Sequence, residues 1–248
     1  MNEKLAVIIL AAGLGTRMKS DKAKVLHTVC GKTMISYVLQ IALAVEALDI
    51  VVVVGHQADQ VKAACLDAPH AKFAYQEQQL GTGHAVMCAL PCISDAVEHV
   101  VILCGDVPML RASTISALLQ DHMQGNRVLS LLAVDVDSPT GYGRIKMDTQ
   151  GRLSGIVEEK DASAEEKRIK LVNAGIYCVD KSFLKSALGK ITPDNAQNEL
   201  YLTDIIEIGY RSGENIGVLV SNDVDEVAGI NTVQDLQFVE KRMAERTH

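Results

Sequence analysis

The chain has 248 residues, 48% of them hydrophobic and 22% charged, the composition of an ordinary globular protein long enough to bury a large core. A formal net charge of −7 argues against a general surface for nucleic acid or anionic membranes, although local cations could still bind an anionic substrate. Six cysteines without a Cys-x-x-Cys spacing argue against a zinc site, and the lack of a signal-peptide pattern or a long apolar run favours a cytoplasmic protein with no membrane partner.

The first predicted element is a strand at residues 5–10, where the unbroken apolar run is typical of a strand buried on both faces of a parallel sheet. Small residues follow at 11–15, with glycines at two of these positions. They let the backbone approach a ligand, and backbone N–H groups together with Arg17 can hold phosphate oxygens. The alternative is a tight turn whose glycines serve only packing. The motifs of a dinucleotide site and of a P-loop are both incomplete, which disfavours those two sites.

Strands and helices then alternate along the first half of the chain. Helical patterns occupy 33–48, 58–66, a segment opening near 82, and 113–124; apolar strand patterns occupy 50–54, 72–76, 99–104 and 128–136. This alternation predicts an α/β fold with a mostly parallel sheet and helices on both faces, in which ligands bind outside the carboxyl ends of the strands. We therefore expect the first loop, the polar loop at 76–84 and Asp106 to converge on one crevice.

The pattern changes from Ser138 onward. The sequence predicts a hairpin of strands 144–147 and 153–158, a surface helix at 162–170, and a strand at 170–179 interrupted at 173–175; helices at 181–188 and 200–212, a strand at 216–220, and an amphipathic helix from 232 to about 246 complete the chain. No linker marks a boundary, so we expect one domain, 1–248. Within it, residues 1–137 form a nucleotide-binding part, 138–231 an α+β extension and 232–248 a C-terminal helix.

A few residues carry the chemistry that the pattern allows. Asp106 follows a buried strand and Gly105, and it is placed to hold Mg²⁺, although it could instead cap a turn or a helix. Arg17 and Lys24 are the natural cations for phosphate charge, or else solvated surface residues. Glu158 lies in a run of charged residues, and this run taken alone indicates a solvent-exposed surface. Asn173 interrupts an apolar strand and needs hydrogen-bond partners, which a ligand could supply.

Several segments taken together resemble one family. These segments are Leu10–Met18, Lys24–His27, Gln76–Ala85, Gly105–Pro108, Pro139–Ile145, Val157–Ala162, Asn173–Ile176, Asn198–Asp204 and Gly229–Asn231. Over essentially its whole length, and in the right order, the chain closely resembles the uridylyltransferase (pyrophosphorylase) domain of the bacterial bifunctional N-acetylglucosamine-1-phosphate uridylyltransferase/glucosamine-1-phosphate acetyltransferases. The first motif alone would fit any sugar-nucleotide pyrophosphorylase, whereas the later ones are more specific. The resemblance implies a Rossmann-like, three-layer α/β/α nucleotidyltransferase fold of the GT-A-like type, with residues 138–231 binding the sugar.

The resemblance also implies a role for each matching residue. Leu10, Ala11, Ala12, Gly13, Lys24, Gln76, Gly81, Thr82, Cys104 and Gly105 would bind the nucleotide. Gly143, Glu158, Asn173, Tyr201, Thr203 and Asn231 would contact the sugar. Arg17, Lys24 and Asp106 would be catalytic, with Asp106 and Asn231 holding Mg²⁺. On this basis Glu158 belongs to the site rather than to a solvated face.

The implied reaction joins UTP and N-acetylglucosamine 1-phosphate to give UDP-N-acetylglucosamine and pyrophosphate, for peptidoglycan and lipopolysaccharide precursors. Such a transfer needs little beyond positioning and charge neutralisation. Two alternatives stay open: transfer to another sugar 1-phosphate, and a non-catalytic nucleotide-sugar-binding protein. The sequence departs from the family at Ala23, where proline is usual. It also has no counterpart of the family's β-helix domain, so we expect no acetyl-CoA site in this chain.

Overall fold

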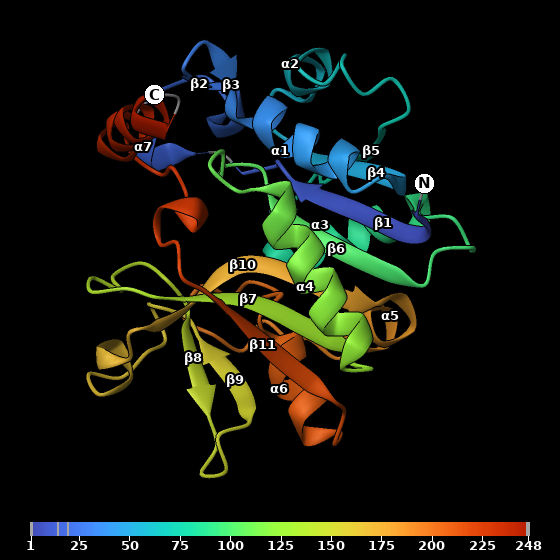
Figure 1. Cartoon of the computed structure of the whole chain (residues 1–248), viewed down its shortest axis with the longest axis vertical. Helices are drawn as coiled ribbons and strands as arrows, with labels where there is room; N and C mark the ends of the chain where they lie inside the picture. Colours follow the sequence, from blue (N-terminus) through green and yellow to red (C-terminus); the bar gives the residue numbers. More distant parts are fainter. Residues whose placement is uncertain (1, 14, 19, 247–248) are drawn as a thin grey trace.

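The computed structural model describes residues 2–13, 15–18 and 20–246, and its centre is a sheet of nine described strands (Figure 1). Across the sheet the order is β11 (Ile216–Ser221), β7 (Leu129–Asp135), β10 (Leu171–Asp180), β6 (His99–Cys104), β1 (Asn2–Leu10), β4 (Ala47–Val54) and β5 (Lys72–Tyr75). The hairpin of β8 (Arg144–Met147) and β9 (Leu153–Val157) branches from β10. A separate small ribbon consists of β2 (Thr28–Val29) and β3 (Lys32–Thr33).

Strand direction agrees with the predicted, mostly parallel sheet. Strands β5, β4, β1 and β6 pair in parallel, as do β7 and β11, whereas β10 runs antiparallel to both of its neighbours. In the central register, Leu10 at the end of β1 lies opposite Val53 of β4 and Cys104 of β6. The carboxyl ends of these three strands therefore meet at one edge, as the alternating pattern predicts.

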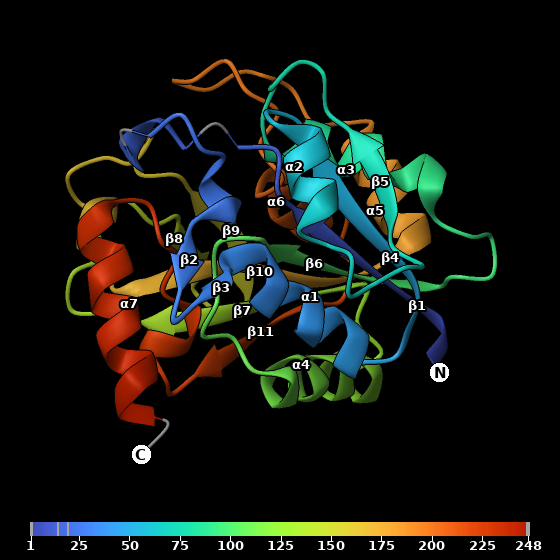
Figure 2. The same ribbon diagram turned by 90° about the horizontal axis from the view of Figure 1, so that it is seen from above.

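Helices cover both faces of the sheet, which makes the three layers. They are α1 (Met34–Ala44), α2 (Ala58–Ala63), α3 (Thr82–Ala89), α4 (Ala112–Gln124), α5 (Lys181–Leu188) and α6 (Asp204–Arg211). Alternate side chains of β1 point to opposite faces: Val7 packs in the core cluster of α1, α2 and α4, and Ile8 packs in that of α3, α5 and α6 (Figures 1 and 2). Both side chains are fully buried, which explains why the sequence of this strand is apolar without alternation.

The last helix, α7 (Val233–Arg246), packs outside these layers. Its Val239 joins a third apolar cluster with Met18, Val29 and Met34, so the helix lies against the β2–β3 ribbon and the segment after β1 (Figure 2). This places the start of α7 beside the carboxyl edge of the sheet, at the end of the molecule opposite the N-terminus (Figure 1).

Several predicted elements differ from the structure. The prediction of a surface helix at 162–170 is wrong, because the segment forms turns and one short 3₁₀ helix, Glu166–Arg168. There Ser163 and Glu166 bond each other's backbone N–H groups, and the chain then enters β10. The helix at 33–48 ends at Ala44 because Glu46 takes a positive φ of 53° before β4 begins. The interrupted strand is one continuous β10, whose register shifts between Asn173 and Tyr177 around Gly175.

The helix predicted at 200–212 begins only at Asp204. The residues before it bond to the loop that precedes α3 instead. None of the described helices has the length and apolar character needed to cross a membrane.

Candidate active site

A cleft of about 320 Å³ opens at the carboxyl edge of the sheet. Its walls are formed by Leu10, Ala11, Ala12, Gly13, Lys24, Val25, Gln76, Gln79, Gly81, Thr82, Ala85, Cys104, Asp106 and Glu199. All the residues expected to bind the nucleotide are among them except Gly105, which lies behind the wall and donates its backbone N–H to the carbonyl of Leu10 at 2.9 Å. The two glycine loops and Asp106 therefore converge on one crevice, as predicted.

The small-residue loop remains attached to the sheet where it enters the cleft. The N–H of Ala11 donates to the carbonyl of Val53 at 3.0 Å, and Ala12 is 4% exposed. Leu14 and Lys19 lie outside the described residues. At Gly15, with φ +63°, a Cβ would lie 2.7 Å from the Cβ of Lys24, so glycine is what lets the loop pack against the lysine.

The opposite wall consists of the loop before α3 and the segment before α6. The N–H of Gly83 donates to the carbonyl of Leu200 at 2.7 Å, and the N–H of Leu202 donates to the hydroxyl oxygen of Thr82 at 3.0 Å. Gly81 has a φ of +109°, and a Cβ there would lie 2.6 Å from the carbonyl oxygen of Leu200. These contacts hold residues 200–202 out of the helix and bring Glu199 to the cleft.

Gln76 is a buried polar side chain in this wall. It is 5% exposed, and its amide nitrogen lies 3.0 Å from the carbonyl of Gly81 and 3.1 Å from Nδ1 of His84. The amide nitrogen of Gln79 donates to the carbonyl of Ala12 at 2.6 Å and so connects the two loops. These contacts fix the width of the cleft between two backbone walls.

Charged and amide groups gather at the other end of the cleft. The ammonium of Lys24 contacts the carboxylate of Asp106 and lies 3.0 Å from the side-chain oxygen of Asn231. The guanidinium of Arg17 donates to the same oxygen of Asn231 at 2.9 Å. A carboxylate oxygen and an amide oxygen thus already converge on one cation, and hard oxygen ligands of this kind suit Mg²⁺.

Backbone contacts fix Asn231 at this point. The N–H of Ile230 donates to the carbonyl of Asp106 at 3.0 Å. The carboxylate of Asp235 accepts from the N–H groups of Asn231 at 2.9 Å and Thr232 at 2.8 Å, and its own N–H donates to the Thr232 hydroxyl at 3.2 Å. This reciprocal capping starts α7 and sets the position of the preceding asparagine.

Of the residues expected to bind the sugar, Asn231 lies with the charged groups, and the other five do not line the cleft. The hydroxyl of Thr203 donates to the carboxylate of Glu158 at 3.0 Å, and a Cβ at Gly143 would lie 3.3 Å from that carboxylate. The N–H of Asn173 donates to the carbonyl of Gly143 at 2.9 Å. These residues form one polar group, joined to the cleft by the segment that carries Glu199 and Thr203.

Asn173 and Tyr201 already have protein partners. The amide nitrogen of Asn173 donates to the Tyr177 hydroxyl at 2.7 Å, and its oxygen accepts from the N–H of Gly175 at 2.9 Å, which shapes the irregular turn of β10. The carbonyl of Gly175 in turn accepts from the thiol of Cys104 at 3.4 Å. The Tyr201 hydroxyl accepts from Gln197 at 2.8 Å. The bulge of β10 therefore connects the polar group to the end of β6.

Burial governs the electrostatics of this polar group. Loss of solvent raises the pKa of Glu158, and the nearby Asp161 adds to the rise, whereas the Thr203 hydroxyl and Arg144 oppose it. Burial also raises the pKa of Asp204 to about 6. Glu159, the next residue in the chain, instead pairs with Arg144 at 2.6 Å. The charged run is thus divided between a half-buried carboxylate, that of Glu158, and one bound to an arginine, that of Glu159.

Four residues of the cleft were not among the predicted site residues, and two of them, Gln79 and Glu199, are polar. Gln79 lies three residues after Gln76 in the same polar loop, and this proximity was the available signal. Glu199 lies far along the chain, and only the contacts of Leu200 with the loop bring it near. It belongs to the segment Asn198–Asp204 that carries the family resemblance, which was the available signal.

We predict that Glu158→Gln stabilises the protein at neutral pH. Because the folded pKa of Glu158 is raised, the parent loses stability as pH rises from the unfolded value of about 4.3 through the folded value, and the glutamine variant does not. Urea unfolding at pH 4 and pH 7 measures the difference. The two proteins should match at pH 4 and diverge at pH 7; a variant less stable at pH 7 would contradict the burial argument.

With the geometry established, comparison with known proteins gives a consistent picture. The model of the nucleotidyl transferase family matches residues 6–225. A solved structure of a UDP-glucose pyrophosphorylase complexed with UDP-glucose superimposes with a TM-score of 0.77, covering 97% of this chain and 98% of that one at 16% identity. This likeness concerns the fold alone, and it agrees with the predicted three-layer nucleotidyltransferase architecture.

Among curated relatives, the chain is similar to proteins named "Bifunctional protein GlmU". It is 43% identical to that of Trichlorobacter lovleyi and 45% identical to that of Alkaliphilus oremlandii, in each case over 98% of this chain and about half of the relative (53% and 52%). It is 42% identical to that of Desulfotalea psychrophila, over 98% of this chain and 71% of the relative. The chain thus spans about half the length of most of these relatives, and it belongs to the nucleotidyl transferase family.

Proposed function

We propose that the chain is a Mg²⁺-dependent uridylyltransferase, which transfers UMP from UTP to N-acetylglucosamine 1-phosphate and releases pyrophosphate. The observation that carries this proposal is the convergence of Arg17, Lys24, Asp106 and Asn231 at one end of a cleft whose other walls combine small residues with a few polar side chains. The similarity to GlmU proteins supports the choice of substrates and a place in cell-wall precursor synthesis.

The end of the cleft between the two loops suits a uracil base and its ribose. Ala11, Ala12 and Gly13 offer backbone groups without bulky side chains, and the buried amide of Gln76 faces the same space. Polar groups held rigidly in a buried wall discriminate strongly between ligands, because a wrong partner leaves them unpaired. Gly81 and Thr82 complete this wall, with the Thr82 hydroxyl also fixing the neighbouring segment.

The charged end suits the triphosphate. Arg17 and Lys24 can neutralise phosphate oxygens during the transfer and on the departing pyrophosphate. Asp106 and Asn231 supply the oxygen ligands for Mg²⁺, which would draw charge from the phosphates when bound. Since Lys24 occupies the position between these two oxygens, its ammonium must leave them when the metal binds, and this frees it for phosphate.

The polar group around Glu158 suits the sugar. A carboxylate can accept hydrogen bonds from sugar hydroxyls. Glycine at position 143 lets the backbone approach this carboxylate, because a Cβ there would lie 2.8 Å from Cγ2 of Ile156 and 3.3 Å from the carboxylate oxygen. We place Asn173, Tyr201 and Thr203 as supports of this subsite. In this scheme residues 1–137 bind the nucleotide and 138–231 bind the sugar. Asp235 of α7 accepts from the N–H of Asn231 and so fixes the charged end.

The transfer needs no enzyme nucleophile. An oxygen of the sugar phosphate attacks the α-phosphorus of UTP in line, the new P–O bond forms, and pyrophosphate leaves with the electron pair of the broken bond. The protein contributes by aligning the two anions and balancing their charge, which orientation and fixed cations achieve without a covalent intermediate.

The direct test is pyrophosphate release from the purified protein with UTP, Mg²⁺ and N-acetylglucosamine 1-phosphate. Parallel reactions replace UTP with ATP, CTP, GTP or dTTP, and the acceptor with other sugar 1-phosphates. We expect release only with UTP and the N-acetylated sugar. Release with another pair would change the substrates but keep the chemistry, whereas no release from folded, nucleotide-binding protein would favour a non-catalytic sensor.

Asp106→Asn should lower turnover by at least about 100-fold, because it removes the charged metal ligand while keeping the side-chain shape. Asp59→Asn serves as the matched control, since Asp59 lies on the exposed surface of α2. Unchanged circular dichroism would show that both variants fold. Full activity of Asp106→Asn would remove Asp106 from the site.

Glu158→Ala should raise the KM for the sugar phosphate on the order of tenfold or more and leave the KM for UTP nearly unchanged, because a charged hydrogen-bond acceptor is lost from one subsite only. The exposed Glu165 provides the control substitution Glu165→Ala. Equal increases for both substrates would show that Glu158 acts on the whole site and not on the sugar.

A further inference from the structure

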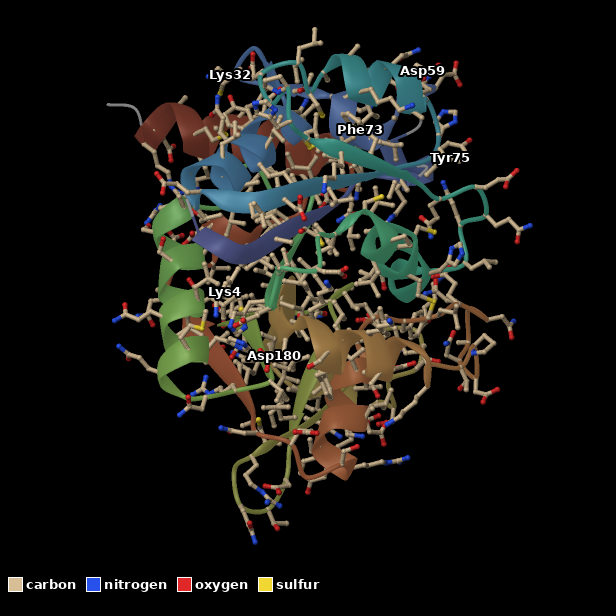
Figure 3. All side chains as sticks on the ribbon, turned by 90° about the vertical axis from the view of Figure 1, so that its right-hand side faces the viewer. Lys4, Lys32, Asp59, Phe73, Tyr75 and Asp180 are labelled. Carbon is tan, nitrogen blue, oxygen red and sulfur yellow. The ribbon has the colours of Figure 1, made fainter. Side chains whose placement is uncertain are left out.

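Three side chains with metal-binding chemistry meet at the end of the sheet opposite the cleft. His99 is the first residue of β6, Asp180 is the last residue of β10, and these two are direct partners in the strand register. His122 reaches them from α4 and is 1% exposed. Figure 3 looks onto this end of the molecule, with Asp180 lying between α4 and α5.

The donor atoms of the three side chains point at a shared position. Nδ1 of His99 lies 2.9 Å and Nε2 of His122 lies 3.2 Å from the same oxygen of Asp180. The two rings stand nearly perpendicular, with 5.4 Å between their centroids. All three donor atoms lie within 4.8 Å of one another, and no other such group of three occurs among the described residues.

We propose that His99, His122 and Asp180 form a binding site for a divalent transition-metal ion of the zinc class. Two imidazole nitrogens and one carboxylate are a common ligand set for zinc, with a fourth position left for water. Tetrahedral zinc at about 2.0–2.1 Å from each ligand requires donor atoms about 3.3 Å apart, close to the two distances observed here. Imidazole ligands favour zinc-class ions over Mg²⁺, so this site is chemically distinct from the oxygen pair of the cleft.

The surroundings of His122 fit a ligand role. Its second ring nitrogen, Nδ1, lies 3.1 Å from the hydroxyl of Ser130, a fully buried residue of β7. With a metal on Nε2, the proton resides on Nδ1 and is donated to this hydroxyl, the arrangement that orients metal-binding histidines in other proteins. The ring is therefore held in the required orientation before any ion binds.

A cavity of about 420 Å³ beside His99 and Asp180 gives the fourth position access to solvent. Lys181 also lines this cavity, but its ammonium donates to the carbonyl of Ser94 at 2.8 Å and lies 3.7 Å from the carboxylate of Asp95. Its positive charge is thus held by other groups and does not occupy the site.

The proposed metal site is separate from the transfer chemistry. His99 and Cys104 are the two ends of β6, and five residue steps at roughly 3.3 Å separate them by about 16 Å. An ion here would link α4 to both β6 and β10 through its three ligands. We therefore expect it to stabilise the fold and to leave substrate turnover unchanged.

Cobalt(II) titration of the untagged 248-residue chain tests the proposal, because tetrahedral Co²⁺ is coloured and reports its ligands. We expect one equivalent to bind with visible absorption and no near-ultraviolet thiolate band, and Zn²⁺ to displace it. With Mg²⁺ present in excess to fill the cleft, added Zn²⁺ should raise the midpoint of thermal unfolding further.

Variants assign the site. His99→Gln, at a partly exposed position, should weaken Co²⁺ binding at least tenfold and abolish the Zn²⁺ effect on unfolding, while its circular dichroism and turnover stay unchanged. His70→Gln, on an exposed loop elsewhere, should behave like the parent. Absence of Co²⁺ binding, or equal binding by His99→Gln, would reduce the cluster to a hydrogen-bond network. A thiolate band lost in Cys88→Ser would also overturn the proposal and assign the ion to Cys88 and His84, which lie 3.8 Å apart.

Discussion

The contact of Lys24 with Asp106 and Asn231 is the interaction on which the rest of the cleft depends. These groups come from three distant parts of the chain, the loop after β1, the end of β6 and the segment before α7. Each is fixed by backbone: glycine at position 15 allows the approach to Lys24, and the carbonyl of Asp106 accepts from Ile230. A cation held between two oxygens marks where a metal and a triphosphate can be balanced, which is the basis of the proposed transferase activity.

The arrangement follows from the sheet. Parallel strands β1, β4 and β6 end together, so the loops that follow them must share one edge, and the antiparallel β10 brings the polar group of Glu158 alongside. Burial of Glu158 costs stability when it is charged, since its pKa is raised. A carboxylate kept at such a cost, bonded by Thr203 and close to the backbone of Gly143, supports the proposed sugar-binding role.

The sequence was informative where the site residues come just after a strand. The apolar run ending at Leu10 and the aspartate two residues after β6 locate the cleft, because strand ends determine side-chain position. Prediction from the sequence failed where tertiary contacts determine the local structure. Residues 200–202 fit a helical pattern but bond to residues 80–83 instead, and residues 162–170 form turns and a short 3₁₀ helix instead of an α-helix. Cysteine spacing, the sequence feature considered for zinc sites, did not indicate His99, His122 and Asp180. These residues are far apart in the sequence and come together only in the folded protein.

The most direct test of the central claim is a crystal structure of the chain with UTP and Mg²⁺. The account predicts uracil beside Gln76, the metal bound by Asp106 and Asn231, and the ammonium of Lys24 moved from these oxygens onto the phosphates. A nucleotide bound outside the cleft would contradict it. So would a Lys24–Asp106 pair that stays intact while the metal binds elsewhere.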